Sequence, residues 1–321
     1  KTRRNSDFDT SRFTEDENNR IFLHYGDMSD GSRLGNLISK IRPDEVYNLA
    51  CTPDVMVSFQ CPEYTCEIAG LGTVKLLEAC KNLDKPVRYY QAGSSEMFGN
   101  NCNDMGFQDE STSFDPQSPY AVAKVLAYNM TKLYRNAYGM FACNGILFNH
   151  VSNRSTIDTL TRKIVHKAIA VLYGSQKCIY LSGLYSVRDF GYAKDYVYAM
   201  WLMLNRDTPD DYVVSTGQTW CTKDIVSYVF TKLGMPLVWS GTGLDEIGTC
   251  NYRVLVRVNP AESTMIGYSK GDHTKIKTRL GWKPTRYLEN ILDEMIEIEQ
   301  EKHMKNLDHS ISRNKSRNFV I

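Results

Sequence analysis

V-R-Y-Y-Q-A-G-S-S-E-M-F-G (residues 87–99) and S-P-Y-A-V-A-K (residues 118–124) are the two stretches that decide the fold. The apolar run Val87–Ala92 predicts a buried strand, which ends in Gly93-Ser94-Ser95-Glu96. Open α/β sheets place their ligands at the carboxyl ends of strands, so we expect hydroxyls and a carboxylate at the ligand edge. Pro119 indicates the first turn of a helix, which the pattern continues to about Tyr138.

Tyr120 and Lys124 are four residues apart and therefore share one face of this helix. A free tyrosine has a pKa of about 10, and a nearby ammonium stabilises the phenolate and lowers that pKa. Tyr120 with Lys124 is thus a candidate acid/base unit, with Ser94 and Glu96 beside it. The alternative is a plain amphipathic helix face. We interpret three other pairs with the same spacing in that way, because they lack the Ser-Ser-Glu and Ser-Pro context: Tyr128/Lys132, Tyr173/Lys177 and Tyr228/Lys232.

Length and composition limit the size of the domains, the kinds of partner and the location that we expect. A chain of 321 residues, 42% of them hydrophobic, is long enough for one large α/β domain and a smaller lobe. A net charge of +1 gives no reason to expect nucleic acid or a membrane as partner. The nine cysteines are scattered without a C-x-x-C pair, which indicates reduced thiols and no metal site. We find no secretory signal and no apolar run of about 18 residues, so we expect a cytoplasmic protein.

The first half of the chain alternates strands and helices. This pattern predicts a parallel sheet covered on both faces, a Rossmann-like doubly wound α/β core. Asp30 is expected to cap the first of its helices. The expected strands are Ile21–Tyr25, Glu45–Ala50, Val87–Ala92 and Phe141–Phe148, and the expected helices are Gly31–Ile41, Tyr64–Leu83 and Pro119–Tyr138.

Beyond Asn149 the regular alternation stops, which predicts a smaller α/β substrate lobe. We expect helices at Thr161–Tyr173, Ala193–Asn205, Thr222–Leu233, His273–Leu280 and Leu288–Met304, and strands at Cys178–Leu181, Asp211–Ser215, Pro236–Ser240 and Val254–Val258. Asp211–Ser215 is expected to return to the main sheet. The predicted dinucleotide domain is therefore 1–155 together with 192–218, the substrate lobe is 156–191 with 219–304, and 305–321 is a flexible tail.

The ordered motifs resemble those of the extended short-chain dehydrogenase/reductases, and within them the GDP-mannose 4,6-dehydratases, over almost the whole chain. The matching segments include D-E-V-Y-N-L-A from Asp44, Y-Q-A-G-S-S-E from Tyr90, S-P-Y-A-V-A-K from Ser118, N-G-I-L-F-N-H from Asn144, R-D-F-G-Y-A-K-D-Y-V from Arg188 and L-G-W-K-P from Leu280. The Gly-rich turn that opens a dinucleotide-binding sheet has no counterpart here, so we expect the chain to begin after that unit.

The resemblance implies NADP as cofactor. From its composition alone, Lys1–Arg20 is interpreted as a solvated arm. The resemblance implies instead that Arg3 and Arg4 match a pair that faces the 2′-phosphate of the cofactor, and guanidinium geometry suits a phosphate. The implied cofactor contacts are Arg3, Arg4, Asn5, Ser6, Asp27, Met28, Leu49, Ala50, Cys51, Thr52, Pro53, Tyr64, Lys124 and His150. The implied contacts to the nucleotide sugar are Asn149, Lys163 and Arg188.

The resemblance also implies a mechanism on GDP-mannose. Tyr120 takes the proton of the C4 hydroxyl while the C4 hydride passes to NADP⁺. The resulting ketone acidifies the C5 proton, which Glu96 removes, and water leaves from C6 with the help of Ser94. The hydride then returns to C6, giving GDP-4-keto-6-deoxymannose on the route to GDP-fucose.

Departures from the family pattern keep two alternatives open. The family's S-H-V is Pro53-Asp54-Val55 here, its arginine before the S-P-Y motif is Gln117, and a carboxylate, Glu262, falls where a diphosphate needs a cation. These losses favour a catalytically inactive homologue that acts as a binding or assembly protein. The other alternative is a related nucleotide-sugar epimerase or dehydratase. The resemblance further implies a homo-oligomer, a dimer or a tetramer.

Overall fold

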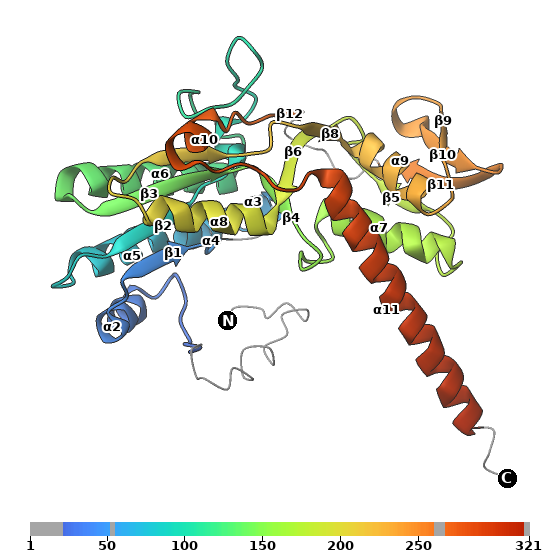
Figure 1. Ribbon diagram of the computed structural model, residues 1–321, viewed down its shortest axis with the longest axis horizontal. Helices are drawn as coiled ribbons and strands as arrows, with labels where there is room; N and C mark the ends of the chain where they lie inside the picture. The colour runs from blue at the N-terminus through green and yellow to red at the C-terminus, as the bar shows by residue number, and fades with distance from the viewer. Residues whose placement is uncertain (1–21, 52–54, 260–266, 318–321) are drawn as a thin grey trace. The chain divides into compact units, whose positions relative to one another are not determined.

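The computed structural model describes residues 22–51, 55–259 and 267–317, and for residues 306–317 the backbone only (Figure 1). Its chain divides into two compact units. Unit 1 takes the described residues up to Phe148 with 195–217 and 269–283, and unit 2 takes 149–194, 218–268 and the residues from Pro284 onward. None of the helices in the described ranges is long and apolar enough to cross a membrane.

The core of unit 1 is a parallel sheet of four strands in the order β1-β2-β3-β7. These are β1 (Glu45–Asn48), β2 (Arg88–Ala92), β3 (Phe141–Leu147) and β7 (Asp211–Val214). Tyr90 of β2 lies opposite Tyr47 of β1 and Cys143 of β3 in the register. The predictions of a parallel α/β sheet and of β7 as a returning strand are confirmed.

Both faces of this sheet are covered, as a doubly wound fold requires. Tyr89 and Ala142 pack on one face with α2 (Gly31–Ile41) and α5 (Gly72–Lys81). Tyr90 and Cys143, their chain neighbours, pack on the other face with α8 (Ala193–Leu204) and α10 (Thr274–Leu280). The long helix α6 (Pro119–Tyr138) follows β2 after a loop and precedes β3, the place that the sequence predicts for it.

Three expectations about unit 1 need correction. Phe22–Tyr25 is not a strand. Its large side chains are exposed, and no described strand pairs with it. A single strand without a partner is not stable. The strand predicted at Glu45–Ala50 ends at Asn48. The single helix predicted at Tyr64–Leu83 is instead α4 (Pro62–Thr65), the π-helical turn η1 (Cys66–Leu71) and α5, preceded by the unpredicted α3 (Val55–Gln60).

Unit 2 is built on short strands. One sheet has the order β5-β11-β10-β9, formed by β5 (Ile179–Leu181), β11 (Arg253–Val258), β10 (Ile247–Cys250) and β9 (Val238–Ser240). Beside it, β6 (Val187–Tyr192) pairs parallel with β4 (Asn149–Val151) and antiparallel with β8 (Thr219–Cys221). The remaining short elements are η3 (Gly243–Asp245) and β12 (Tyr268–Ser269). The sequence pattern missed β4, β6, β8, β10 and β12, because runs this short lack a clear period.

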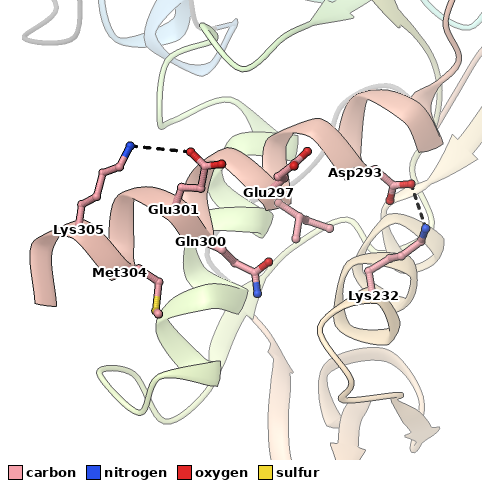
Figure 2. A pocket seen from close by; sticks show the side chains of 8 residues that line it. Lys232, Asp293, Glu297, Gln300, Glu301, Met304 and Lys305 are labelled. Atoms are coloured by element: carbon pink, nitrogen blue, oxygen red, sulfur yellow. Dashed lines mark hydrogen bonds and ion pairs between the residues drawn. The ribbon is translucent and has the colours of Figure 1, made fainter. Parts of the chain in front are cut away.

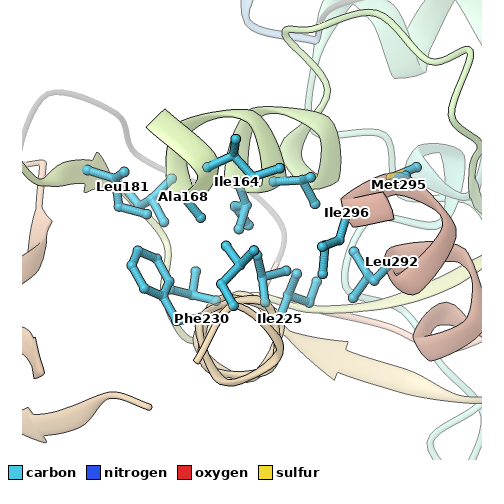
Figure 3. Close-up of a cluster of buried hydrophobic side chains, with 14 of the residues drawn as sticks. Ile164, Ala168, Leu181, Ile225, Phe230, Leu292, Met295 and Ile296 are labelled. Atoms are coloured by element: carbon cyan, nitrogen blue, oxygen red, sulfur yellow. The ribbon is translucent and has the colours of Figure 1, made fainter. Parts of the chain in front are cut away.

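The hydrophobic core of unit 2 lies among α7 (Leu160–Leu172), α9 (Thr222–Lys232) and α11 (Leu288–Arg317). Figure 3 shows Ile164 of α7 facing Ile225 of α9, with Leu292 of α11 beside them. The expectation that the last helix ends at Met304 is wrong, because α11 continues to Arg317. Residues 305–317 contain neither proline nor glycine, so no residue in this stretch favours an end to the helix.

Candidate active site

The turn after β2 places a hydroxyl and a carboxylate together. The strand ends at Ala92, and Ser94 caps the short 3₁₀ helix η2 (Ser95–Phe98) by accepting a 3.2 Å hydrogen bond from the Glu96 backbone N–H. Gly93 makes this turn possible, because a Cβ at that position would lie 2.9 Å from the carbonyl oxygen of Gly145. Ser94 is buried and Glu96 is partly buried at the carboxyl end of the parallel sheet.

The start of α6 places Tyr120 and Lys124 at the same edge. Ser118 caps the helix by accepting a hydrogen bond from the Ala121 N–H, and Pro119 occupies the first turn, as the sequence predicts. Lys124 is 2% exposed, and its Nζ donates a 2.8 Å hydrogen bond to the carbonyl oxygen of Ala92. The same Nζ lies 5.7 Å from the centre of the Tyr120 ring. The helix is thereby tied to the end of β2.

The Tyr120 hydroxyl is the point where these groups meet. Burial raises the pKa of Tyr120, the charge of Cys51 raises it further, and a hydrogen bond with Ser94 opposes both effects. The charge of Glu96 adds to the upward shift. Ser94, Glu96, Tyr120 and Lys124 thus form one cluster. The pKa of Tyr120 is nevertheless raised and not lowered, contrary to the sequence-based prediction, because its burial is the largest effect. Burial also lowers the pKa of Lys124, whose ammonium donates to the Ala92 carbonyl oxygen.

The implied cofactor contacts are placed in part. The Asp27 carboxylate accepts hydrogen bonds from the backbone N–H and hydroxyl of Ser29, which lower its pKa, and Met28 packs closely against Gly72. Leu49 and Tyr64 are exposed. Arg3, Arg4, Asn5, Ser6, Thr52 and Pro53, together with Glu262 of the departures above, lie outside the described residues.

The loop after β1 is held by a buried polar network that sequence reasoning missed. The side-chain amide of Asn48 lies within hydrogen-bond distance of Thr73, Tyr89 and Gln91, and its oxygen accepts from the Ala50 N–H at 3.2 Å. Asn48 is 3% exposed. A polar residue at the end of an apolar strand is a weak signal, and its partners lie far away in the sequence.

The implied substrate contacts all lie in unit 2. Asn149 is in β4, where it pairs with Phe190 of β6; the next residue, His150, is an implied cofactor contact and pairs with Gly191. Arg188 is in β6, opposite Trp220 of β8, and Lys163 is in the first turn of α7. The four predicted catalytic residues lie in unit 1.

The other Tyr/Lys pairs that are four residues apart have structural partners. The Tyr128 hydroxyl donates to Asp211, and Tyr173 stacks on His303. Figure 2 shows Lys232 directed at Asp293 of α11, with an Nζ to Oδ2 distance of 2.9 Å, and the Tyr228 hydroxyl donates to the same carboxylate. A cavity of about 540 Å³ opens beside this ion pair, and none of the predicted site residues lines it. Tyr128 and Tyr228 therefore each have a carboxylate partner within the fold.

A doubly wound parallel sheet with a Tyr-x-x-x-Lys helix facing a Ser/Glu turn defines the class of the extended short-chain dehydrogenase/reductases. Among solved structures, the chain is similar to RMD from Pseudomonas aeruginosa complexed with NADPH, with a TM-score of 0.75, 20% identity, and coverage of 88% of this chain and 89% of that one. This likeness confirms the fold.

Sequence comparison then identifies the family. A family model described as GDP-mannose 4,6 dehydratase matches residues 1–295. The chain is 40% identical to the GDP-mannose 4,6-dehydratase of Yersinia enterocolitica, covering 92% of this chain and 84% of that one. It is 42% identical to GDP-mannose 4,6 dehydratase 2 of Caenorhabditis elegans, covering 92% and 80%. The chain belongs to the GDP-mannose 4,6-dehydratase family.

Proposed function

We propose that this chain is a hydro-lyase that converts GDP-mannose into GDP-4-keto-6-deoxymannose. The observation that carries the proposal is the convergence of Ser94, Glu96, Tyr120 and Lys124 at the carboxyl end of β2. The chain matches the GDP-mannose 4,6-dehydratase family over most of its length, which supports the same reaction. A phenol, an ammonium, a hydroxyl and a carboxylate are the groups that oxidation at C4 and elimination across C5 and C6 require.

Each residue has a proposed role that follows from its position. Tyr120 accepts the C4 hydroxyl proton. Lys124 holds the start of α6 against Ala92, and its ammonium favours the phenolate once the hydroxyl has lost its proton. Glu96 removes the C5 proton. Ser94, whose hydroxyl acts to lower the pKa of Tyr120 and accepts from the Glu96 N–H, assists the departure of the C6 hydroxyl as water.

The donor set fits a nicotinamide cofactor. Among the described residues, Lys124 donates only to Ala92, which leaves two N–H donors of its ammonium for the hydroxyls of a ribose. A bound oxidised nicotinamide supplies the hydride acceptor, and its positive charge lowers the pKa of a nearby phenol. Arg3 and Arg4, as the pair that matches the family's 2′-phosphate contact, support NADP over NAD.

The nucleotide sugar is proposed to bind through Asn149, Lys163 and Arg188 of unit 2, whose two cations suit a diphosphate. We also propose that the protein forms a homo-oligomer. Three apolar side chains at helical spacing on α6 are exposed: Val122 (49%), Leu126 (38%) and Leu133 (49%). Such a row on a surface helix is typical of an interface between subunits. Light scattering during gel filtration, on the protein and on Leu126→Glu, tests it.

Incubating the purified protein with GDP-mannose and NADP⁺ tests the reaction. We expect a 4-keto-6-deoxy product with no net reduction of NADP⁺. Glu96→Gln is expected to stop dehydration. A protein that binds both ligands but forms no keto product would favour the inactive homologue, and inversion at a sugar carbon without loss of water would favour an epimerase.

A further inference from the structure

Unit 2 contains a cavity of about 430 Å³ that none of the site residues named so far lines. Its walls are residues 183–186 of the loop that leads into β6, Leu244 and Glu246 of the turn that contains η3, and Val258 at the end of β11. Most of these residues are apolar or glycine. The volume is within the range of about 300–1,000 Å³ that is usual for ligand sites.

Glu246 supplies a buried carboxylate to this cavity. Its side chain is 3% exposed, and its Oε1 accepts hydrogen bonds from the Lys223 Nζ at 2.7 Å and from the Tyr185 hydroxyl at 2.9 Å. Its Oε2 is also buried, and within the described ranges no donor reaches it. A buried acceptor without a hydrogen-bond partner costs free energy, so a ligand that brings a donor to Oε2 is stabilised.

The charge of Glu246 is already balanced. Lys223 carries the opposite charge, and its hydrogen bond with Glu246 raises the pKa of the ammonium. Among the described residues that line the cavity, Glu246 is the only charged one. A second cation at Oε2 would bring an unpaired positive charge into mostly apolar surroundings. The partner that Oε2 lacks is therefore a neutral N–H or O–H donor.

The side chains beside the carboxylate favour a flat ligand. Tyr185 and Leu244 line the cavity and are 63% and 65% exposed, so they can turn and admit a planar ring to the buried oxygen. Aromatic and apolar side chains are the surfaces on which a nucleobase stacks. Guanine carries two donors side by side on one edge, N1–H and the 2-amino group. The ring nitrogen at the same edge of adenine is an acceptor, and the N–H of uracil lies between two carbonyl oxygens, so a carboxylate favours guanine.

The position of the cavity in the sequence agrees with a base. The loop at 183–186 runs directly into β6, whose second residue is Arg188, a proposed contact of the diphosphate. In GDP-mannose a ribose joins the base to the diphosphate. We propose that this cavity binds the guanine base of the nucleotide sugar, and that Glu246 selects the base by accepting its N–H donors at Oε2. This assignment rests on the proposed function, from which it takes the nucleotide.

Calorimetric titration of the full chain with nucleoside diphosphates tests the assignment without turnover, with NADP⁺ present to fill the cofactor site. The probes are GDP, inosine diphosphate, which lacks the 2-amino group, and UDP. Glu246→Gln keeps the shape of the side chain but places an amide in the carboxylate position. Asp245→Asn is the matched control, because it removes a charge from the neighbouring exposed residue, which does not line the cavity. Gly267→Leu narrows the cavity: Gly267 lines it, and a Cβ there would meet no atom within 4 Å.

The unsubstituted protein should bind GDP about 10-fold more tightly than inosine diphosphate and about 10–100-fold more tightly than UDP, the scale of one well-placed base contact. In Glu246→Gln the advantage of GDP over inosine diphosphate should shrink to within about twofold, with UDP binding unchanged. Gly267→Leu should weaken GDP binding about tenfold or more at an unchanged melting temperature, because the base no longer fits. Asp245→Asn should match the unsubstituted protein.

Two results would overturn the assignment. One is an unchanged preference for GDP in Glu246→Gln, and the other is an equal loss of all three nucleotides, which would give Glu246 a role in the fold and not in base recognition. Should Glu246→Gln fail to fold, Gly267→Leu decides, and normal GDP binding in that variant would contradict the site. A protein that binds GDP as expected but forms no keto product would contradict the proposed function alone. Turnover of GDP-mannose with the base preference intact in Glu246→Gln would contradict this assignment alone.

Discussion

The ammonium of Lys124 donates a 2.8 Å hydrogen bond to the carbonyl oxygen of Ala92, and this bond links the helix that carries Tyr120 to the strand that leads to Glu96. Lys124 is almost fully buried, so its charge is desolvated and its pKa is lowered. Burying an ammonium costs free energy unless the charge is paired and hydrogen-bonded.

Lys124→Met tests this contact. Methionine keeps the length and apolar volume of the side chain, so the fold should be retained. We expect turnover to fall about 100-fold or more, the scale of an acid/base contribution. Lys132→Met, an exposed lysine on the same helix, is the matched control and should retain activity. Measuring kcat with the melting temperature separates the two effects, and full activity in Lys124→Met would contradict the assigned role.

Glu96→Gln tests whether Glu96 serves the elimination step separately from the oxidation step at Tyr120. The amide cannot remove the C5 proton, so dehydration should fall by about 10²–10⁴-fold, while oxidation at C4 by Tyr120 continues. Absorbance of reduced nicotinamide should then accumulate on addition of GDP-mannose, which it does not in the unsubstituted protein. Glu63→Gln, an exposed carboxylate at the start of α4, is the control. Product formation at the normal rate in Glu96→Gln would assign the C5 step to another group.

The Arg135–Asp211 ion pair is expected to stabilise the fold at neutral pH and to lose this effect in acid. The two groups form paired hydrogen bonds of 2.8 and 2.7 Å, and Asp211 also accepts from Asn144 and Tyr128. Burial alone would raise the pKa of Asp211, but Arg135 and its other donors lower it overall. Because the folded-state pKa lies below the unfolded value, the pair stabilises the fold above about pH 3.9 and loses this effect as the pH falls through the folded-state pKa.

Asp211→Asn leaves Arg135 without a charge partner and should lower the free energy of unfolding by about 3–5 kcal/mol at neutral pH. The loss should shrink as the pH falls. Asp84→Asn removes the carboxylate of the exposed Arg42 pair and is expected to change little. Urea unfolding over a pH series measures both variants, and equal losses from the two would show that burial of the Arg135 pair is irrelevant.

How much the sequence could predict depends on whether the signal is local. The Ser118-Pro119 start of α6 and the apolar run of β2 were predictable because a cap and a strand pattern are encoded within a few residues. Phe22–Tyr25 shows the limit, since its apolar pattern is that of a strand but pairing depends on a neighbour. The buried network of Asn48 could not be predicted, because it joins residues far apart in the chain.

Gly93→Ala tests the close approach at the end of β2. Its new Cβ would lie 2.9 Å from the Gly145 carbonyl oxygen, which already accepts the Gly93 N–H, so backbone must shift. We expect a loss of about 1–3 kcal/mol in the free energy of unfolding, with reduced turnover because Ser94 moves too. Gly35→Ala is the matched control: it lies in α2 with no atom within 4 Å of the new Cβ, and should stabilise by about 0.5–1 kcal/mol. Equal effects of both variants would contradict the argument.

Glu110 and Asp109 are adjacent carboxylates with opposite expected responses to pH. Burial raises the pKa of Glu110, although its Oε1 accepts a 2.7 Å hydrogen bond from the Val213 N–H. Burial also acts on Asp109, but hydrogen bonds from Ser111 outweigh it and lower the pKa of that carboxyl. The ionised form of Glu110 therefore opposes folding above its folded-state pKa, and stability should rise as the pH falls from there towards about 4.3.

Glu110→Gln keeps an oxygen for the Val213 N–H and removes the buried charge, so we expect a higher melting temperature at neutral pH. This gain should vanish near pH 4, where the native carboxyl is protonated as well. Asp109→Asn removes a carboxylate whose ionised form the fold stabilises, so the variant should melt at a lower temperature than the unsubstituted protein at neutral pH. The two melting temperatures should become equal again in acid. Thermal melts of both variants across pH decide the sign at each position. A lower melting temperature for Glu110→Gln would mean that the ionised carboxylate stabilises the loop between Glu96 and Tyr120, the reverse of what its burial predicts.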